Sequence, residues 1–311
     1  MFVTGVYMGV SGLLLKQIVI MFILMGIGFI FYKIKFLSDQ GSKDMAKMLL
    51  YLVIPVVIIK NFVIERTAEN IEMLIHATVI SVIAMVIAMV VSYIFFGKRD
   101  GVANFSSSFS NAGFIGIPLV EATLGSKAVF YISIMIVLVN LLQWTYGLWI
   151  ITDDASVIKP KKVLTNPVIV AVFIGLIVFL CEIPMPEIAT TVFGTIAGLN
   201  TPLAMMVSGV YLAQSDLVKM FKKKNVYLVS LVRLFVAPLV TLLIFKVLPF
   251  GTIDLKLAIL ITAACPVGSN VAVFANMYDK DYVSAVEQVC MTTIFCLLTM
   301  PFIITLALNL L

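Results

Sequence analysis

The chain of 311 residues is too apolar and too sparsely charged for a soluble globular protein. Hydrophobic residues make up 62% and charged residues 12% of it, with a mean hydropathy of +1.16, whereas soluble proteins carry roughly 25% charged residues. We therefore expect a lipid bilayer to cover most of its surface. The formal net charge of +5 lies in short loops and does not indicate nucleic-acid binding, and four unclustered cysteines with a single histidine predict neither a metal site nor another cofactor.

Apolar runs of about the length needed to cross a bilayer recur along the whole chain. They predict an all-α integral membrane protein with ten transmembrane helices, the second, fourth and ninth being the most polar or interrupted by proline. The runs are 12–32, 42–60, 71–96, 102–124, 126–151, 164–181, 188–213, 225–248, 255–277 and 282–310.

Lysine and arginine residues collect in one set of alternate loops and flanks. Of the 21 such residues, 14 fall in that set, 6 fall in the other, and Arg233 lies inside a predicted span. Because loops rich in lysine and arginine face the cytoplasm, this bias predicts a multi-pass protein of the plasma membrane with both termini outside. The richer set is Lys33, Lys35, Lys43, Lys47, Lys98, Arg99, Lys159, Lys161, Lys162, Lys219, Lys222, Lys223, Lys224 and Lys280.

Two pairs of proline-marked spans recur at nearly constant spacing. Pro55 and Pro202 are 147 positions apart, and Pro118 and Pro266 are 148 apart. Since five spans separate the members of each pair, the second copy crosses the membrane in the opposite sense. The spacing predicts a 5+5 inverted repeat, with a first five-helix repeat over 1–156 and a second over 157–311.

The fourth and ninth predicted spans contain residues that break helices. Glycine and proline interrupt Asn111-Ala-Gly-Phe-Ile-Gly-Ile-Pro118, and Cys265-Pro-Val-Gly-Ser-Asn270 has the same character. Paired broken helices in the two halves indicate a binding site at the membrane midplane, and half-helix N-termini there suit a carboxylate. The alternative is a pair of kinked helices whose polar side chains only bond across helices. The predicted substrate-binding residues are Asn111, Gly113, Gly116, Pro118, Pro266, Gly268, Ser269 and Asn270.

The segment FSNAGFIGIPLV, together with ACPVGSNVAVFANMYDKDYVSAVEQVCMTTIFCLLTMP, resembles the auxin efflux carrier family. That family belongs with the bile-acid, arsenite and riboflavin transporter-like carriers. The resemblance covers essentially the whole chain. The prokaryotic members of the family are secondary carriers linked mainly to small organic acids. It implies that the broken fourth and ninth helices cross. It also implies a stationary scaffold of spans 1, 2, 6 and 7 and a mobile transport unit of spans 3–5 and 8–10.

Polar residues inside predicted spans are candidates for cation or proton coupling, or for polar support of the site. Arg233 is interpreted as pairing with an acid inside the bundle, with attraction of an anion as the alternative. For Glu121 and Glu287, contact with interfacial water is an equally good interpretation. The coupling or support candidates are Glu121, Asn140, Gln143, Glu287 and Gln288.

Together these features predict a carrier, secondary active or facilitative, for a small organic anion such as a malonate-like, malate-like or auxin-like acid. It would work by elevator-type alternating access. A sodium-coupled symporter of the bile-acid type, a channel and a sensor remain alternatives. The sequence also leaves open whether a proton or sodium is coupled and whether the chain forms a homodimer. Motifs of an intramembrane enzyme or an ATP-driven pump are absent, since neither G-x-S-x-G, H-E-x-x-H nor a Walker sequence occurs.

Overall fold

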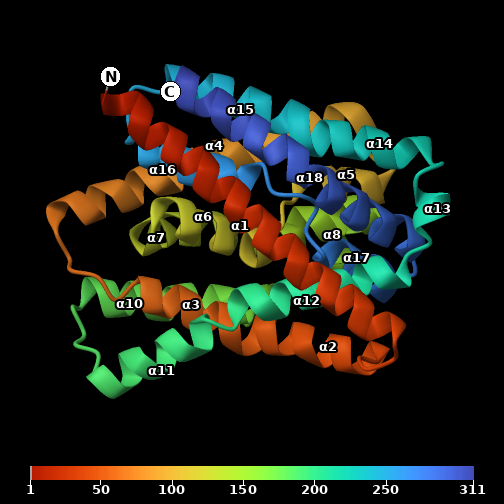
Figure 1. The fold of residues 1–311 in the computed structure, drawn as a ribbon, viewed down its shortest axis with the longest axis horizontal. Coiled ribbons are helices and arrows are strands. Elements are labelled where there is room, and N and C mark those ends of the chain that lie inside the picture. The colour runs from red at the N-terminus through yellow and green to blue at the C-terminus, as the bar shows by residue number, and fades with distance from the viewer. Residues whose placement is uncertain (1) are drawn as a thin grey trace.

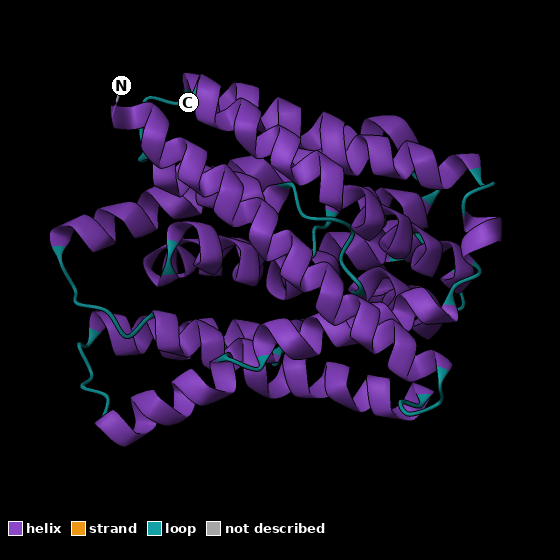
Figure 2. Cartoon of the chain, viewed as in Figure 1, coloured by secondary structure: helices purple, strands orange, loops and turns teal. Residues whose placement is uncertain are grey.

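The computed structural model describes residues 2–311, with side chains described for 12–216 and 218–311, and in this part of the chain the protein is built from helices joined by short loops (Figure 2). Its elements are of two kinds: α-helices, and short π- or 3-10-helical turns. In the first half they are α1 (Phe2–Lys33), α2 (Asp39–Met48), η1 (Leu49–Val53), α3 (Ile54–Asn61), α4 (Ala68–Phe96), α5 (Gly101–Ser108), η2 (Ala112–Gly116), α6 (Ile117–Leu124), α7 (Ser126–Leu142), η3 (Gln143–Gly147) and α8 (Leu148–Thr152).

The second half continues in the same way. Its elements are η4 (Ala155–Val157), α9 (Pro160–Leu164), α10 (Pro167–Leu180), α11 (Glu187–Ala197), α12 (Asn200–Gln214), α13 (Leu217–Met220), α14 (Lys224–Leu231), η5 (Val232–Val236), α15 (Ala237–Val247), α16 (Ile253–Ala263), α17 (Asn270–Met277) and α18 (Tyr282–Leu310).

Six helical runs are long and apolar enough to cross a bilayer, and two shorter apolar helices accompany them. Large apolar side chains also cover the outside of the bundle: Ile94 is 73% and Leu298 75% exposed. Since water would disfavour so much apolar surface, lipid must cover it. The protein is a multi-pass membrane protein, and the count of ten spans stays a prediction. The long runs are Gly12–Lys33, Ala68–Phe96, Ser126–Thr152, Glu187–Gln214, Lys224–Val247 and Tyr282–Leu310, and the shorter helices are Ala112–Leu124 and Pro167–Leu180.

Polar contacts between loops show that the loops gather at two ends of the bundle, which lie at the right and left of Figure 1. At the lysine-rich end, Gln214 Nε2 donates to Asp39 Oδ1 at 2.7 Å, and Asn225 Nδ2 donates to Asp100 Oδ2 at 2.7 Å. The Tyr32 hydroxyl also donates to Asp39. The hydrogen bonds from Tyr32 and Gln214 lower the pKa of the Asp39 carboxyl group.

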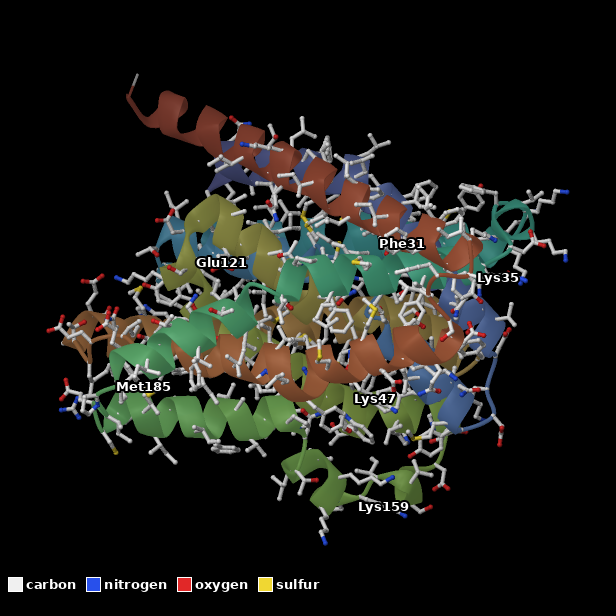
Figure 3. The ribbon with its side chains drawn as sticks, turned by 60° about the horizontal axis from the view of Figure 1, so that its bottom comes forward. Phe31, Lys35, Lys47, Glu121, Lys159 and Met185 are labelled. Atoms are coloured by element: carbon white, nitrogen blue, oxygen red, sulfur yellow. The ribbon has the colours of Figure 1, made fainter. Side chains whose placement is uncertain are left out.

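At the other end, Arg66 lies 3.7 Å from Glu182, and Lys127 lies 3.4 Å from Glu69. The loops that meet at each end are the ones that the alternating lysine and arginine content of the loops assigns to the same side of the membrane. Figure 3 shows the same separation, with Lys35 and Met185 at opposite ends of the long axis.

Helices of the four predicted scaffold spans pack in two pairs. Helix α1 lies against α12, and α3 lies against α10. The first pair approaches so closely that a methyl group at Gly28 would overlap the Met206 carbonyl, and one at Gly209 would overlap that of Met25. In Figure 1, α2, α3, α10, α11 and α12 form a layer at one side, and α1 runs across the front of the molecule. The site lies between this layer and the remaining helices.

Candidate functional site

The two predicted breaks meet inside the bundle. Ser110 and Val267 form an isolated antiparallel β-bridge. Asn111 N–H donates to the Pro266 carbonyl at 2.8 Å, and Gly268 N–H donates to the Phe109 carbonyl at 3.0 Å. Helices α5 and α16 therefore arrive at this crossing with their C-termini, and η2–α6 and α17 leave it with their N-termini. Hydrogen bonds between the two breaks satisfy backbone groups that lipid could not.

Proline does not break the fourth span where the sequence suggests. The chain leaves the helix at Phe109, nine residues before Pro118, and Pro118 lies in the first turn of α6 directly after the π-helical turn η2. Pro55 follows η1 and Pro238 follows η5 in the same way. Because proline lacks an N–H and its ring clashes with the carbonyl four residues earlier, a wider π-turn relieves the contact without ending the helix.

A cavity of about 40 Å³ lies at the crossing. One wall comes from the two breaks and a second from α7 and η3. The third, on the side of the layer described above, comes from Leu50 of η1, Ile54 of α3 and Val168 of α10. Seven residues that the sequence singled out line it together. They are Asn111, Gly113, Gly268, Ser269 and Asn270 from the predicted substrate set, and Asn140 and Gln143 from the coupling or support set.

Hydrogen-bond donors in the cavity are uncharged, and several have no partner among the described residues. The hydroxyl groups of Ser110 and Ser269 are buried and unpaired. Asn111 Oδ1 accepts from Phe114 N–H at 3.3 Å and caps η2. The Nδ2 of the same side chain donates to no acceptor among the described residues. Asn270 Nδ2 is already engaged, donating to Gln143 Oε1 at 2.8 Å. No described lining residue carries a formal charge.

A wider cavity of about 420 Å³ continues from the crossing. It shares Leu50, Asn140, Val168 and Asn270 with the inner cavity, and it extends to Trp144 and Lys162. Lys162 belongs to the lysine-rich loop 152–163. The wider cavity therefore lies between the crossing and the lysine-rich end of the bundle.

A family of known proteins described as "Membrane transport protein", which includes the auxin efflux carriers, matches residues 13–162 and again residues 152–304. The chain belongs to this family. The two matches follow one another, and the predicted repeat boundary between 156 and 157 falls in their overlap. No curated protein matches the chain.

In this membrane transport protein, the remaining predicted substrate residues shape the crossing without lining the cavity. Pro266 accepts the backbone hydrogen bond from Asn111. A methyl group at Gly116 would lie 3.0 Å from Thr262 Cγ2, so Gly116 lets η2 approach α16 closely. Pro118 is buried in the first turn of α6.

The predicted coupling carboxylates lie away from the cavity of this transport protein. Glu121 is exposed and lies nearer the end marked by Met185 than the end marked by Lys35 (Figure 3). Glu287 is 6% exposed and pairs with Lys223 at 2.7 Å in the lysine-rich half. Gln288 Nε2 donates to the Ser284 hydroxyl at 3.1 Å. A coupling role for these three residues stays a prediction.

Arg233 has a different setting from the one that the sequence suggests. Among the described residues it faces no carboxylate; instead it donates to backbone carbonyls of the crossing. The sequence indicates an intramembrane charge at this position, but backbone acceptors have no side-chain signature. Ser110, which also lines the cavity, was missed by the sequence reasoning, although its place next to Asn111 was a usable signal.

Proposed function

We propose that the protein is a carrier, secondary active or facilitative, for a small organic anion, and that the carboxylate group of the substrate binds at the crossing of the two breaks. The observation that carries this proposal is the cavity itself, with its unpaired donors and no charged lining. The N–H groups of Ala112, Gly113, Ser269 and Asn270 have no partner in the described chain. Free N–H groups at helix starts, together with the helix dipole, favour an anion. The substrate class, the coupling and the mechanism are part of the proposal.

We further propose that the cavity moves relative to the layer that forms its third wall. Asn111, Gly113 and Asn270 belong to the predicted transport unit, whereas Leu50, Ile54 and Val168 belong to the predicted scaffold. A site at the boundary of two packed units can be exposed to either side when one unit slides along the other. The opening toward Lys162 then represents the inward-open state of an elevator-type cycle.

Binding and transport can be tested separately on the purified protein. We expect some members of a panel of mono- and dicarboxylates to raise the melting temperature, because a ligand that binds only the folded state stabilises it. The matching amides should not do so. A complete absence of stabilisation by carboxylates, with stabilisation by amides or cations, would refute an anion site.

Counterflow in proteoliposomes then distinguishes a carrier from a channel. Unlabelled substrate inside the vesicles should accelerate uptake of labelled substrate, since a carrier returns loaded and a channel does not cycle. Uptake that is unaffected by internal substrate favours the channel. Replacement of sodium by choline tests the symporter alternative, which predicts loss of uptake.

The orientation can be tested by labelling single cysteines in a chain without its native ones. The lysine bias predicts that Lys222→Cys, in the loop 214–225, is labelled by an impermeant maleimide only after the cells are opened. Glu182→Cys, at the other end of the bundle, should react from outside and serves as the matched position. The reverse labelling pattern would overturn the orientation.

A further inference from the structure

Arg233 lies at the centre of the crossing and is 1% exposed. It belongs to the π-helical turn η5, which projects it between α5 and α16. Its Nη1 donates to the carbonyls of Ser107 at 3.1 Å and Ser108 at 3.3 Å, at the end of α5. Its Nε donates to the Cys265 carbonyl at 3.1 Å, and Nη2 donates to that of Ala263, at the end of α16.

The carbonyls of Ser107, Ser108 and Ala263 are among those that helices leave unpaired at their C-termini, and that of Cys265 lies just beyond the end of α16. The planar guanidinium carries several donors in a fixed fork, so one side chain can bond both helix ends at once, which a lysine cannot do in the same geometry. A buried charge is expensive unless it is well compensated. Arg233 therefore bonds carbonyl groups that the C-cap residues Phe109 and Ala264 leave free.

The electrostatic balance of the crossing depends on this side chain. Each helix end carries roughly half an elementary charge, positive at the N-terminus and negative at the C-terminus. Two N-termini and two C-termini meet here, so their contributions roughly cancel. The guanidinium then leaves about one net positive charge beside a cavity whose described lining has none of its own.

We propose that Arg233 is a positioning residue that makes the crossing an anion site. It offsets the two negative helix ends, so that the two positive ends and the free donors dominate the potential in the cavity. Because the net charge is about one, the cavity matches a single carboxylate group. This inference rests on the proposed function for the identity of the ligand, but the potential itself can be measured without any ligand.

A cysteine in the cavity wall can report that potential. Asn140 lines both cavities, lies on α7 outside the crossing, and bonds only to the Ile136 carbonyl of its own helix. The reporter is Asn140→Cys in a chain whose four native cysteines are replaced by alanine. Its rates of reaction with an anionic and a cationic methanethiosulfonate of similar size are measured. Each rate is divided by the rate at which the same reagent reacts with β-mercaptoethanol in solution, and the ratio of the two normalised rates, anionic to cationic, reports the potential.

We expect the anionic reagent to be favoured with Arg233 present, and Arg233→Gln to lower the ratio of anionic to cationic rate on the order of tenfold or more. That is the size of the effect of one unit charge at roughly 10 Å with an effective dielectric constant of about 20. Arg233→Lys should keep most of the ratio, because it keeps the charge, while lowering the melting temperature. A loss that is only structural would lower the melting temperature and leave the ratio unchanged, which would overturn the proposal.

Lys256→Gln is the matched control. Lys256 is also buried, at 9% exposure, and lies near the far end of the same half-helix α16, where Nζ donates to the Leu248 carbonyl at 2.8 Å. Its removal should leave the ratio unchanged. If Arg233→Gln does not fold, the chain with Arg233 still decides the matter: a ratio at or below one, relative to the solution thiol, contradicts the proposal. A ratio above one with no carboxylate binding would refute the substrate class and leave the role of Arg233 standing.

Discussion

The double substitution Ile54→Cys and Gly113→Cys is expected to abolish transport when the two thiols are oxidised, and reduction is expected to restore it. A Cβ atom at position 113 would lie 3.2 Å from Ile54 Cδ1, so the two positions face each other across the boundary between the predicted units. A covalent link there would hold the two units in the arrangement seen in this structure. If the cycle requires one unit to slide along the other, a linked protein cannot complete it.

A second pair of cysteines tests whether linking at the crossing is harmful in itself. A Cβ at position 116 would lie 3.6 Å from Thr262 Cβ, within the range of a disulfide. Gly116→Cys with Thr262→Cys joins η2 to α16 inside the predicted transport unit. Cys265 must be replaced in this variant, since its Sγ would lie 3.6 Å from the new Cβ.

Uptake into proteoliposomes is measured for both pairs before and after oxidation, with the extent of linking read from gel mobility. The 116/262 pair should keep its uptake when oxidised, and the 54/113 pair should lose nearly all of it. Full turnover by a completely linked 54/113 protein would show that the two units do not move past each other at this boundary.

The sequence predicts the general plan of the site because its main signals are local. Glycine, proline and asparagine in 111–118 and 265–270 mark two breaks. The two breaks are paired by the nearly constant spacing of the prolines in the two halves of the chain. The crossing that the family resemblance implied appears as the bridge between Ser110 and Val267. Asn140 and Gln143 share a helix face by their spacing, and that face is the one that lines the cavity.

Other features depend on contacts that local patterns do not specify. The predicted break over 111–118 begins slightly earlier, at Phe109, and Pro118 itself does not end a helix, because a π-turn can accommodate proline within a continuous helix. Glu287 pairs with Lys223, 64 positions away in the chain. Arg233 bonds to carbonyls that are free only because the helices end there. The family match supports transport but leaves the substrate to experiment.

Asn111→Asp is expected to weaken carboxylate binding more than hundredfold while leaving the fold intact. Asn111 Oδ1 caps η2 by accepting from Phe114 N–H, and an aspartate oxygen can do the same. A negative charge at a helix start is also favourable to the helix. The unpaired Nδ2 donor, however, would become an acceptor that bears a like charge toward the substrate, and like charges brought together cost several kcal/mol.

Asn111→Ala tests the same side chain without adding a charge. It removes the donor and the cap together, so we expect affinity to fall roughly ten- to hundredfold, since a hydrogen bond to a charged group contributes about 1.5–3 kcal/mol. Stability should fall by about 1 kcal/mol from the lost cap. Asn270→Ala should affect affinity less, because its amide is already bonded to Gln143.

Melting temperature and ligand affinity measured on the same purified variants decide between a binding and a purely structural asparagine. If Asn111 contacts the substrate, Asn111→Ala loses affinity together with the cap, and Asn111→Asp loses affinity at an unchanged melting temperature. If it only caps the half-helix, Asn111→Ala lowers the melting temperature and binds carboxylate as well as the unaltered protein, whereas Asn111→Asp keeps the melting temperature. The alanine variant decides whether Asn111 contacts the substrate, because it removes the donor at the crossing without placing a negative charge in the cavity.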